Sequence, residues 1–534
     1  MDRSGAGIGG YLFGAVRFLA VGADGDWFPL WRRRYRMNWS TALPLLVLGS
    51  SLIPGLMIFF LSEEHVVART ALNLASALLK IVLIGGMFWG MLHGYHYESR
   101  LPLLPGLDLV LRAEPLSMLF VLLSAGLWLV TTVYAIGYLE ESPYRSRFFG
   151  FFSLCVTATV GIALAGNLMT FLVFYELLTL CTYPLIVHRG TEVARRAGRI
   201  YLTYTIAGGA LLLLSSVWLY TLAGTLEFTA RGFLSGLDTS LHPTLMLIFA
   251  LLIAGLGVKA ALLPLHGWLP LAMVAPAPVS ALLHAVAVVK AGAFGIVRVV
   301  YDVYGIEFAT GLGVTLPLTI LAAATIIYGS LRALFQDELK RRLAFSTVSQ
   351  VSYIVLGIAV AGPVATIGGL IHLVHQGVQK ITLFFCAGNL AETLGIHKIS
   401  EMNGVGWRMP WTMSAFTIGA FGMIGAPPLA GFFSKWYLGR GALDAGQDWV
   451  ILILAGSSIL NAAYFLPILY IAWFKKPPDS WPAERTFGRQ ETAWALLLPP
   501  LVTALMTLVL GLLASAPFGL LEWARLIVNR GLAQ

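Results

Sequence analysis

The sequence predicts an all-α polytopic membrane protein with about fourteen transmembrane helices. Three observations lead to this prediction. Of 534 residues, 58% are hydrophobic and only 11% are charged, and the mean hydropathy is +0.80. Apolar stretches of about 18 residues or more, the length needed to cross a bilayer, recur along the whole chain. Short polar loops rich in Lys and Arg separate them. This composition excludes a soluble enzyme.

The predicted spans follow one another with few residues between them. They fall near 43–61, 71–93, 115–138, 148–166, 168–187, 201–223, 243–263, 276–300, 311–332, 342–361, 364–388, 410–433, 449–473 and 493–516. We divide the chain into an extension (1–36), three N-terminal helices (37–140), a central core (141–475), and a polar loop with a C-terminal transmembrane helix (476–534). No segment is typical of a second soluble domain.

The extension contains an apolar piece, Ile8–Gly22, that Arg17 interrupts. It is too short to span, and an interfacial helix is one interpretation of it. A second hypothesis is that translation starts at Met37, because Met-Asn-Trp-Ser leads directly into the first span. The broken, glycine-rich apolar stretch is not typical of a signal peptide.

Charge in the loops predicts the topology. The odd-numbered loops hold most of the Lys and Arg residues, including clusters at 195–199 and 340–342. By the positive-inside rule these loops are cytoplasmic and both termini lie on the outer face of a bacterial inner membrane. The arginine cluster at 32–36 opposes this orientation. The net charge of +9 therefore fits topology signals and does not indicate nucleic-acid binding.

Nothing in the chain predicts a cofactor, a metal site or a catalytic centre. The three cysteines, Cys155, Cys181 and Cys386, lie in apolar runs without zinc or iron–sulfur spacing. No Gly-rich nucleotide loop follows a strand.

Two lysines stand inside apolar, proline-broken segments. Lys259 lies in the segment 257–270, and Lys435 lies in the segment 425–436. An ammonium near the bilayer centre costs roughly 2.5–3.5 kcal/mol on insertion scales, so such a residue is a functional-site candidate. Membrane helices tolerate prolines where other groups satisfy the freed backbone. This combination is typical of ion-translocating proteins.

Glu176 is the acidic partner that we expect for Lys259. A lone carboxyl group in hydrocarbon stays neutral, whereas beside an ammonium it can ionise. A Glu176–Lys259 pair would therefore act as a switch for proton affinity. The alternative interpretation is a static buried ion pair that joins two helices.

Two further segments carry candidate relay residues. His284 and Lys290 lie six residues apart, on different faces of a regular helix. His372 and Lys380 lie eight apart on one face, and His375 and Gln379 form an adjoining pair. A histidine accepts and releases protons near neutral pH, so these side chains suit a water-filled proton path. Metal binding by the two histidines of the second segment is a weaker alternative.

A faint internal repeat is also present. Five spans at 148–300 and five at 311–473 each have a broken fourth span that contains a lysine. Interrupted helices at corresponding positions of two halves point to a transport site.

Six ordered motifs together resemble the antiporter-like subunits of respiratory complex I, membrane-bound hydrogenases and Mrp-type cation/proton antiporters. They are Tyr175-Glu-Leu, 259–270, 276–284, 337–350, 375–385 and 425–435. The run Lys380-Ile-Thr-Leu-Phe-Phe-Cys-Ala-Gly, with Arg408-Met-Pro-Trp-Thr-Met after it, is most similar to the D-type subunits of Mrp antiporters.

The resemblance implies fourteen helices with two inverted five-helix repeats and broken helices 7 and 12. It implies proton-relay roles for Glu176, Lys259, His284, Lys290, His372, His375, Lys380 and Lys435. The chain departs from some family members because 201–223 has no acidic residue. We therefore expect a proton-translocating subunit of a hetero-oligomeric Mrp-type antiporter, which also moves sodium or potassium ions.

Three alternatives stay open. The chain is a membrane-arm subunit of an NADH:quinone oxidoreductase or hydrogenase, a proton-coupled subunit of an inorganic-carbon uptake system, or a scaffold whose buried charges are structural.

Overall fold

The computed structural model describes residues 38–104, 107–140, 142–487 and 490–532. Within them, twelve helices are long and apolar enough to cross a membrane. Two more crossings complete the expected set of fourteen. One is α16 (Pro363–Leu394), whose His, Gln and Lys residues lower its hydropathy, and the other is the broken pair α18 (Pro410–Ile424) and α19 (Ala430–Asp444). The prediction of a polytopic all-α membrane protein is confirmed.

The elements follow the predicted order along the chain. Before the first break they are α3 (Trp39–Phe59), α4 (Val66–Leu92), β1 (Glu98–Leu104), β2 (Leu107–Arg112), α5 (Pro115–Tyr138), α6 (Arg145–Leu164), α7 (Leu168–Ile186), α8 (Glu192–Ala223), η1 (Thr239–Leu241) and α9 (His242–Ala260). The middle part contains α10 (Trp268–Leu271), η2 (Ala272–Val274), α11 (Ala277–Ala285), α12 (Val288–Arg298), the π-helix η3 (Val299–Tyr304) and α13 (Ile306–Gly311).

The second half begins with α14 (Thr315–Leu334) and α15 (Leu339–Ala359). After α16 come η4 (Ile399–Glu401), α17 (Val405–Arg408), α18, α19, α20 (Trp449–Phe474), α21 (Trp494–Leu512) and α22 (Leu520–Leu532). The helices α8 and α16 are both 32 residues long and stand third in the two predicted five-span sets.

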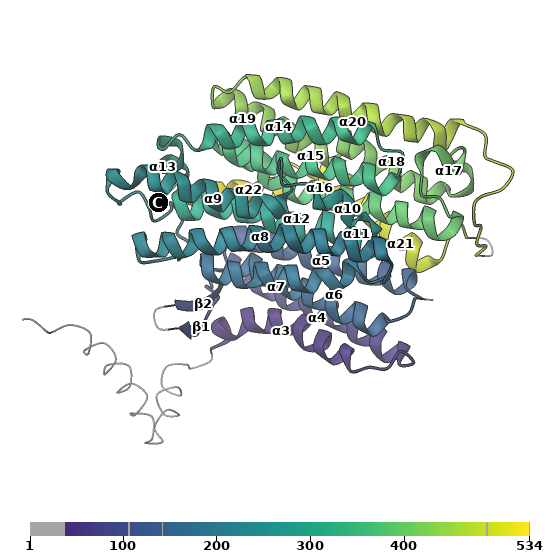
Figure 1. The fold of residues 1–534 in the computed structure, drawn as a ribbon, viewed down its shortest axis with the longest axis horizontal. Coiled ribbons are helices and arrows are strands. Elements are labelled where there is room, and N and C mark those ends of the chain that lie inside the picture. Colours follow the sequence, from purple (N-terminus) through teal and green to yellow (C-terminus); the bar gives the residue numbers. More distant parts are fainter. Residues whose placement is uncertain (1–37, 105–106, 141, 488–489, 533–534) are drawn as a thin grey trace, which may run out of the picture.

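The helices lie side by side with roughly parallel axes (Figure 1). Figure 1 shows α3 and α4 along one edge of the bundle, α19 and α20 along the opposite edge, and α12, α15 and α16 between them. The apolar stretches of the span Ala277–Tyr304 and of α15 are buried inside the bundle, and so are residues 365–390 of α16. Five of the eight predicted relay residues lie on these buried parts: His284, Lys290, His372, His375 and Lys380.

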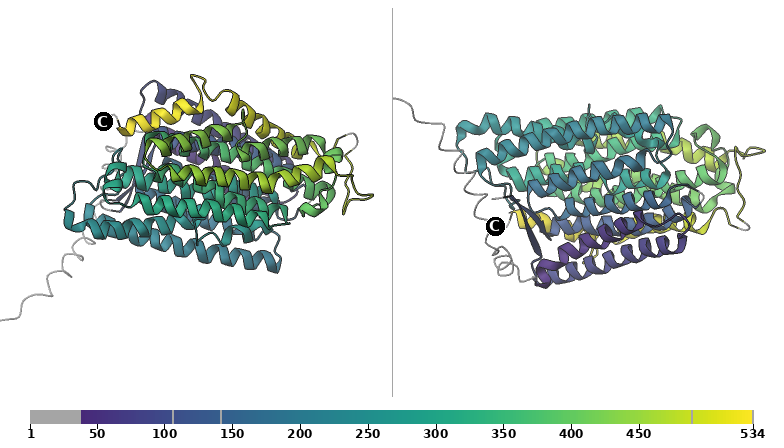
Figure 2. Two further views of the ribbon diagram at one scale, coloured as in Figure 1. Left: turned by 90° about the horizontal axis from the view of Figure 1, so that it is seen from above. Right: turned by 60° about the horizontal axis from the view of Figure 1, so that its bottom comes forward.

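The two ends of the bundle differ in composition. The antiparallel hairpin β1–β2 lies at one end, which we call the hairpin end, with Glu98 opposite Arg112 in its register. The described residues of the loops after α5, α7, α14 and α16, together with 475–487, lie at the other end, which we call the arginine-rich end (Figures 1 and 2). The loops that charge counting predicts to be cytoplasmic thus share one end.

Both helices predicted to be broken are interrupted in similar ways. The helix α9 ends at Ala261, which has a φ of 56°, and α18 ends at Gly425, which has a φ of 94°. Left-handed residues commonly end helices because they let the next amides reach the last carbonyls. A cis-proline follows each end, at Leu263–Pro264 and at Pro427–Pro428.

The structure adds three features that we did not predict. The predicted span 276–300 is interrupted at Val286 and Ala287, between α11 and α12. The region 98–112, which we read as a loop, forms the β-hairpin. The helix α22 follows the last predicted span and packs against α5 and α16, where Trp523 Nε1 donates to the carbonyl of Pro115 at 3.0 Å. The predicted extension, residues 1–36, lies outside the described residues.

Candidate functional site

Lys259 stands in the last turn of the half-helix α9. Groups beyond the helix end satisfy two of its last backbone carbonyls. Leu262 N donates to the Gly257 carbonyl at 2.9 Å, and Trp268 Nε1 donates to the Val258 carbonyl at 2.7 Å. A cation near a helix C-terminus interacts favourably with the helix dipole. The break therefore places Lys259 beside a helix C-terminus inside the bundle, which a continuous helix would not provide.

The ammonium of Lys259 contacts Tyr175 on α7. It donates to the Tyr175 carbonyl and lies 3.2 Å from the centre of the Tyr175 ring. The lysine side chain is fully buried. A cation over an aromatic face gains about 2 kcal/mol when it is desolvated. One aromatic residue thus supplies both a carbonyl and a ring to the charge.

Glu176 does not pair with Lys259 in this structure. Within the described residues, no ion pair of 4.0 Å or less joins the two side chains. The Glu176 carboxyl group faces Gly209 on α8 instead, and its buried Oε1 atom has no hydrogen-bond partner. In this arrangement the Tyr175 carbonyl, and not the Glu176 carboxyl group, receives the Lys259 ammonium.

His284 on α11 and Lys290 on α12 flank the interruption between these two helices. The break at Val286 and Ala287 removes the constraint that would place them on different faces of one regular helix. The His284 ring lies 4.5 Å from that of Phe384 on α16. Among the residues that the structure describes, neither ring nitrogen of His284 nor Nζ of Lys290 has a hydrogen-bond partner, although both side chains are fully buried.

Two neighbouring helices, α9 and α16, pack closely against α11 and α12 near this interruption. A Cβ at Gly292 of α12 would collide with the backbone of Lys259 and Ala260, and a Cβ at Gly377 of α16 would lie 2.9 Å from the Ala285 carbonyl. Glycine is needed at such backbone approaches. Through these glycines, α12 packs on the end of α9, and α16 packs on the end of α11.

The helix α16 contributes three of the predicted residues. His372 Nδ1 lies 2.8 Å from Ser434 Oγ, and His375 Nδ1 has no partner. Lys380 Nζ donates to the Leu343 carbonyl at 3.2 Å and to Ser346 Oγ at 2.6 Å. All three side chains face the interior of the bundle.

Lys435 begins the second half of the other broken helix. Its ammonium donates to the last carbonyls of α18, Met423 at 3.0 Å and Ile424 at 2.8 Å, and to Ser458 Oγ at 3.0 Å. This position caps the C-terminus of α18, where a cation is favoured. Both broken helices thus have a lysine beside the break.

Some of the predicted residues are close enough to influence one another electrostatically: Lys290 and Lys435 with His372, and Lys380 with His284. Seven of the eight residues lie on α9, α11, α12, α16 and α19. The eighth, Glu176, lies on α7 next to Tyr175, which contacts Lys259.

Further buried polar atoms without hydrogen-bond partners in the described residues lie on α15 and α16. Besides those already described, they belong to Gln350, Tyr353, Gln376 and Gln379. Each buried polar group without a partner costs about 1–3 kcal/mol. Buried water normally satisfies such groups. The arrangement therefore favours internal water between the ionisable side chains.

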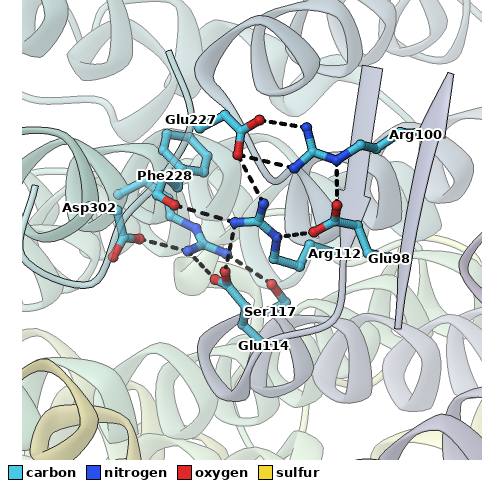
Figure 3. A network of polar contacts seen from close by, with 9 residues as sticks. Glu98, Arg100, Arg112, Glu114, Ser117, Glu227, Phe228 and Asp302 are labelled. Atoms are coloured by element: carbon cyan, nitrogen blue, oxygen red, sulfur yellow. Dashed lines mark hydrogen bonds and ion pairs between the residues drawn. The ribbon is translucent and has the colours of Figure 1, made fainter. Parts of the chain in front are cut away.

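A second charged cluster lies at the hairpin end (Figure 3). Arg298 Nη1 bonds to Asp302 at 2.6 Å and to Glu114 at 2.8 Å. Glu227 bonds to Arg100 at 2.5 Å and to Arg112 at 3.2 Å. We call this set, which also includes Glu98, the hairpin-end network.

The network fixes the charge of its outer carboxylates. Hydrogen bonds from Arg100, with the charge of Arg112, hold the pKa of Glu227 below its usual value. Burial acts to raise the pKa of Glu98, but its bonds to Arg112 and Arg100 outweigh burial, and the net pKa is lowered. Beside the network is a cavity of about 560 Å³ that Asp302, Tyr301 and Thr366 help to line.

Sequence reasoning missed several polar residues that the structure places inside the bundle. Lys80 on α4 and Lys340 on α15 both bury their ammonium groups, Lys340 on the Ala275 carbonyl at 2.7 Å. The signal for Lys80 was available, since it stands inside the predicted span 71–93. The Tyr175 carbonyl had no such signal, because its role depends on a contact between distant segments. Ser346 is a polar position on the helix after the charged loop 336–342 and was expected to form hydrogen bonds between helices, but the sequence did not identify Lys380 as its partner.

Comparisons with known proteins agree with this arrangement. A family profile described as NADH:quinone oxidoreductase/Mrp antiporter, TM, matches residues 165–461. NADH-quinone oxidoreductase subunit N of Desulforudis audaxviator is 36% identical over 88% of this chain and 94% of its own length. The D-type subunit of a Na(+)/H(+) antiporter of Bacillus subtilis is 28% identical over 89% of this chain and 94% of its own length. Hydrogenase-4 component B of Escherichia coli is 33% identical over 65% of this chain, which spans only 53% of that protein.

Solved structures share the fold. A chain of the membrane-bound sulfane sulfur reductase, described as an archaeal respiratory membrane complex, superposes with a TM-score of 0.80 at 24% identity, covering 92% of this chain and 98% of that one. A chain of the Mrp complex from Dietzia superposes with a TM-score of 0.76 at 24% identity, covering 92% of this chain and 97% of that one. The resemblance seen in the sequence is confirmed: this multi-pass membrane protein belongs to the NADH:quinone oxidoreductase/Mrp antiporter transmembrane family.

Proposed function

We propose that the chain translocates protons as an integral subunit of a multisubunit membrane complex of the Mrp cation/proton antiporter type. The observation that carries this proposal is the set of buried and half-buried Lys, His and Glu side chains inside the bundle, which lie on α7, α9, α11, α12, α16 and α19. Within the described residues, several of them also have polar atoms without a hydrogen-bond partner: Glu176, His284, Lys290, His372 and His375. Ionisable groups inside a membrane protein usually mark ion paths.

In this proposal the eight residues act as stations. A proton that arrives at one buried lysine changes its charge, and the neighbouring groups respond. Glu176 swings between Gly209 and the Lys259 ammonium, so that the pair is alternately open and closed. Moving one charge through 100 mV is worth about 2.3 kcal/mol, which modest changes in proton affinity at each station can supply.

The surroundings of the chain follow from the same proposal. The core 141–475 carries the path, while 37–140 and 476–534 flank it. The arginine-rich end faces the cytoplasm and both termini face the outside of a bacterial inner membrane, because positive loops are retained inside. Sodium or potassium would cross the complex in exchange for protons. The relatives are named as subunits or components of larger assemblies, which supports partner subunits in the membrane.

One observation favours a second kind of complex as the assembly that contains this subunit. The identity of 36% to an NADH-quinone oxidoreductase subunit N extends over 94% of that protein. In that case the same proton path would serve the membrane arm of a quinone-linked oxidoreductase. Purifying the native complex through a tag on this chain distinguishes the two: small antiporter subunits support the first host, and iron–sulfur or quinone-site subunits support the second.

The test of translocation uses that purified complex in liposomes. We expect Lys259→Ala to abolish the proton flux while the complex still assembles. Lys475→Ala, which removes an exposed lysine at the arginine-rich end, is the matched control and should leave the flux unchanged. An assembled Lys259→Ala complex with wild-type flux would contradict the proposed function.

A further inference from the structure

A further buried lysine lies outside the path described above. Lys80 stands at the middle of α4 and is fully buried. Its ammonium donates to the Val47 carbonyl of α3 at 2.9 Å and to Ser51 Oγ at 2.7 Å, and it lies 5.4 Å from the Trp128 ring centre. These helices precede residue 165, where the family profile begins to match.

The surroundings of Lys80 match those of Lys380. Lys380 also bonds to one carbonyl and to one serine hydroxyl a turn further along the same neighbouring helix, at Leu343 and Ser346. An aromatic ring, Phe465, lies 6.0 Å from its ammonium. The N-terminal helices therefore repeat a lysine environment that belongs to the central path.

A polar stripe leads from the arginine-rich end to Lys80. Arg69, Asn73, Ser76 and Lys80 follow one another at intervals of four, three and four residues, so they share one face of α4. All four are buried. The Asn73 Oδ1 atom has no partner within the described residues, although its amide nitrogen donates to the Arg69 carbonyl at 2.9 Å.

The outer end of the stripe reaches the surface. Arg69 donates to Ser146 Oγ at 2.9 Å, and its guanidinium lies 3.8 Å from the carboxylate of Glu63, which is 44% exposed. Water can therefore approach this end of the stripe. The unpartnered Asn73 oxygen is then the first buried group that such water would satisfy.

Hydroxyl groups continue beyond Lys80 to another helix. Ser51 Oγ lies 2.7 Å from Thr157 Oγ1 on α6. Each hydroxyl both donates and accepts a hydrogen bond, so the pair can hand on a proton. The helix α6 is the first helix of the first five-span set.

Few other titratable groups lie on the elements that pack against α4. The helix α3 has none and α5 has only Tyr134 and Tyr138. On α6 they are Arg145 and Arg147, at the arginine-rich end, and Cys155. The helix α22, whose Trp523 ring contacts Phe88 of α4, adds Glu522 and Arg525, which pair with each other. Within the described residues, no carboxylate lies within 4.0 Å of the Lys80 ammonium. No counter-ion therefore holds a permanent charge at this position.

We propose that Lys80 is an additional proton-exchanging site, loaded from the arginine-rich end through the polar stripe of α4 and emptied toward α6 through Ser51 and Thr157. This inference rests on the proposed function. In loading, the Nζ lone pair takes a proton from a hydronium ion and leaves water. In unloading, one N–H bond breaks and the proton passes to the Ser51 hydroxyl as that hydroxyl gives its own proton to Thr157. The Thr157 hydroxyl in turn releases its original proton to a water molecule, which becomes a hydronium ion.

The test compares variants of the tagged native complex in liposomes, with proton flux measured across a series of pH values. Lys80→Arg keeps a cation but cannot release a proton in this range. We expect it to lower the flux several-fold and to flatten its pH dependence. A Lys80→Arg complex with wild-type flux and pH profile would show that Lys80 is only a structural cation, and would overturn the inference.

A second variant tests the route. Asn73→Leu replaces the unpartnered amide by an apolar side chain of similar size and leaves the bonds of Lys80 in place. We expect a several-fold lower flux at unchanged melting temperature. Thr131→Val on α5 is the control, because its hydroxyl bonds only to the Leu127 carbonyl of its own helix. Wild-type flux in Asn73→Leu would exclude the stripe, even if Lys80→Arg does not assemble.

These outcomes separate the inference from the proposed function. If the wild-type complex carries no proton flux, the proposed function is wrong. If the wild-type complex carries flux that Lys259→Ala abolishes and the Lys80 and Asn73 variants retain, only the inference is wrong.

Discussion

The ammonium of Lys259 lies on the carbonyl and ring of Tyr175, and the carboxyl group of the next residue, Glu176, faces away toward Gly209. A single residue of α7 thus holds the lysine while its expected ion-pair partner is turned to α8. The contact with Tyr175 is favourable enough to compete with an ion pair, since a desolvated cation–π contact is worth about 2 kcal/mol. The first two predictions test this competition.

Replacing the Tyr175 ring should close the pair. In Tyr175→Leu the ammonium loses its aromatic contact, and we expect it to move toward Glu176. Infrared difference spectroscopy measures this as a shift of the Glu176 carboxyl band, which the Glu176→Gln variant identifies. Tyr175→Phe keeps the ring and loses only the hydroxyl bond to the Gly255 carbonyl at 3.2 Å, so its spectrum should remain that of the wild type. Identical spectra for the Leu and Phe variants would refute the role of the ring.

Adding a methyl group at Gly209 should act from the opposite side. A Cβ at this position would meet the Glu176 carboxyl group, which is the end of a flexible side chain and can move away. We expect Gly209→Ala to change the proton flux by about tenfold, as a change of about 1.4 kcal/mol in the barrier would. The melting temperature should change little. Gly236→Ala is the control, because a Cβ there has no neighbour within 4 Å.

Removing the Arg298 guanidinium should destabilise the hairpin end. Arg298→Met leaves Glu114 and Asp302 without their shared cation, and breaking a buried ion pair costs about 3–5 kcal/mol. A lower melting temperature of the purified complex measures this loss. Arg525→Ala removes a pair with Glu522 in which both side chains are more than 40% exposed, and should have an effect of about 0–1 kcal/mol. Equal effects of the two variants would contradict the burial argument.

Acid should weaken the same end of the molecule. The pKa values of Glu98 and Glu227 are lowered in the folded protein, so their ion pairs stabilise it fully above the ordinary glutamate pKa of about 4.3. This stabilisation is lost as the pH falls through the lowered pKa values. Glu227→Gln should lower the melting temperature at neutral pH and weaken its decline below pH of about 4. A melting profile for Glu227→Gln parallel to that of the wild type across the acid range would rule out this linkage.

The sequence alone determined the membrane class, the fourteen crossings, the breaks beside Lys259 and Lys435, and the family. Hydropathy, prolines and motif order are properties of contiguous residues, so they can be read without knowing which helices meet. The spacing of His372, Gln376 and Lys380 likewise predicted one polar face on a helix that proved to be buried.

Tertiary structure alone decided which atoms these residues face. The break between His284 and Lys290, the orientation of Glu176, and the carbonyl and serine that receive Lys80 and Lys380 depend on contacts between helices distant in the sequence. The hairpin of 98–112 and the amphipathic helix α22 are too polar or too short to register as spans, and they are stabilised by ion pairs and packing at the end of the bundle. Partners of buried polar groups are set by long-range packing, which no local pattern encodes.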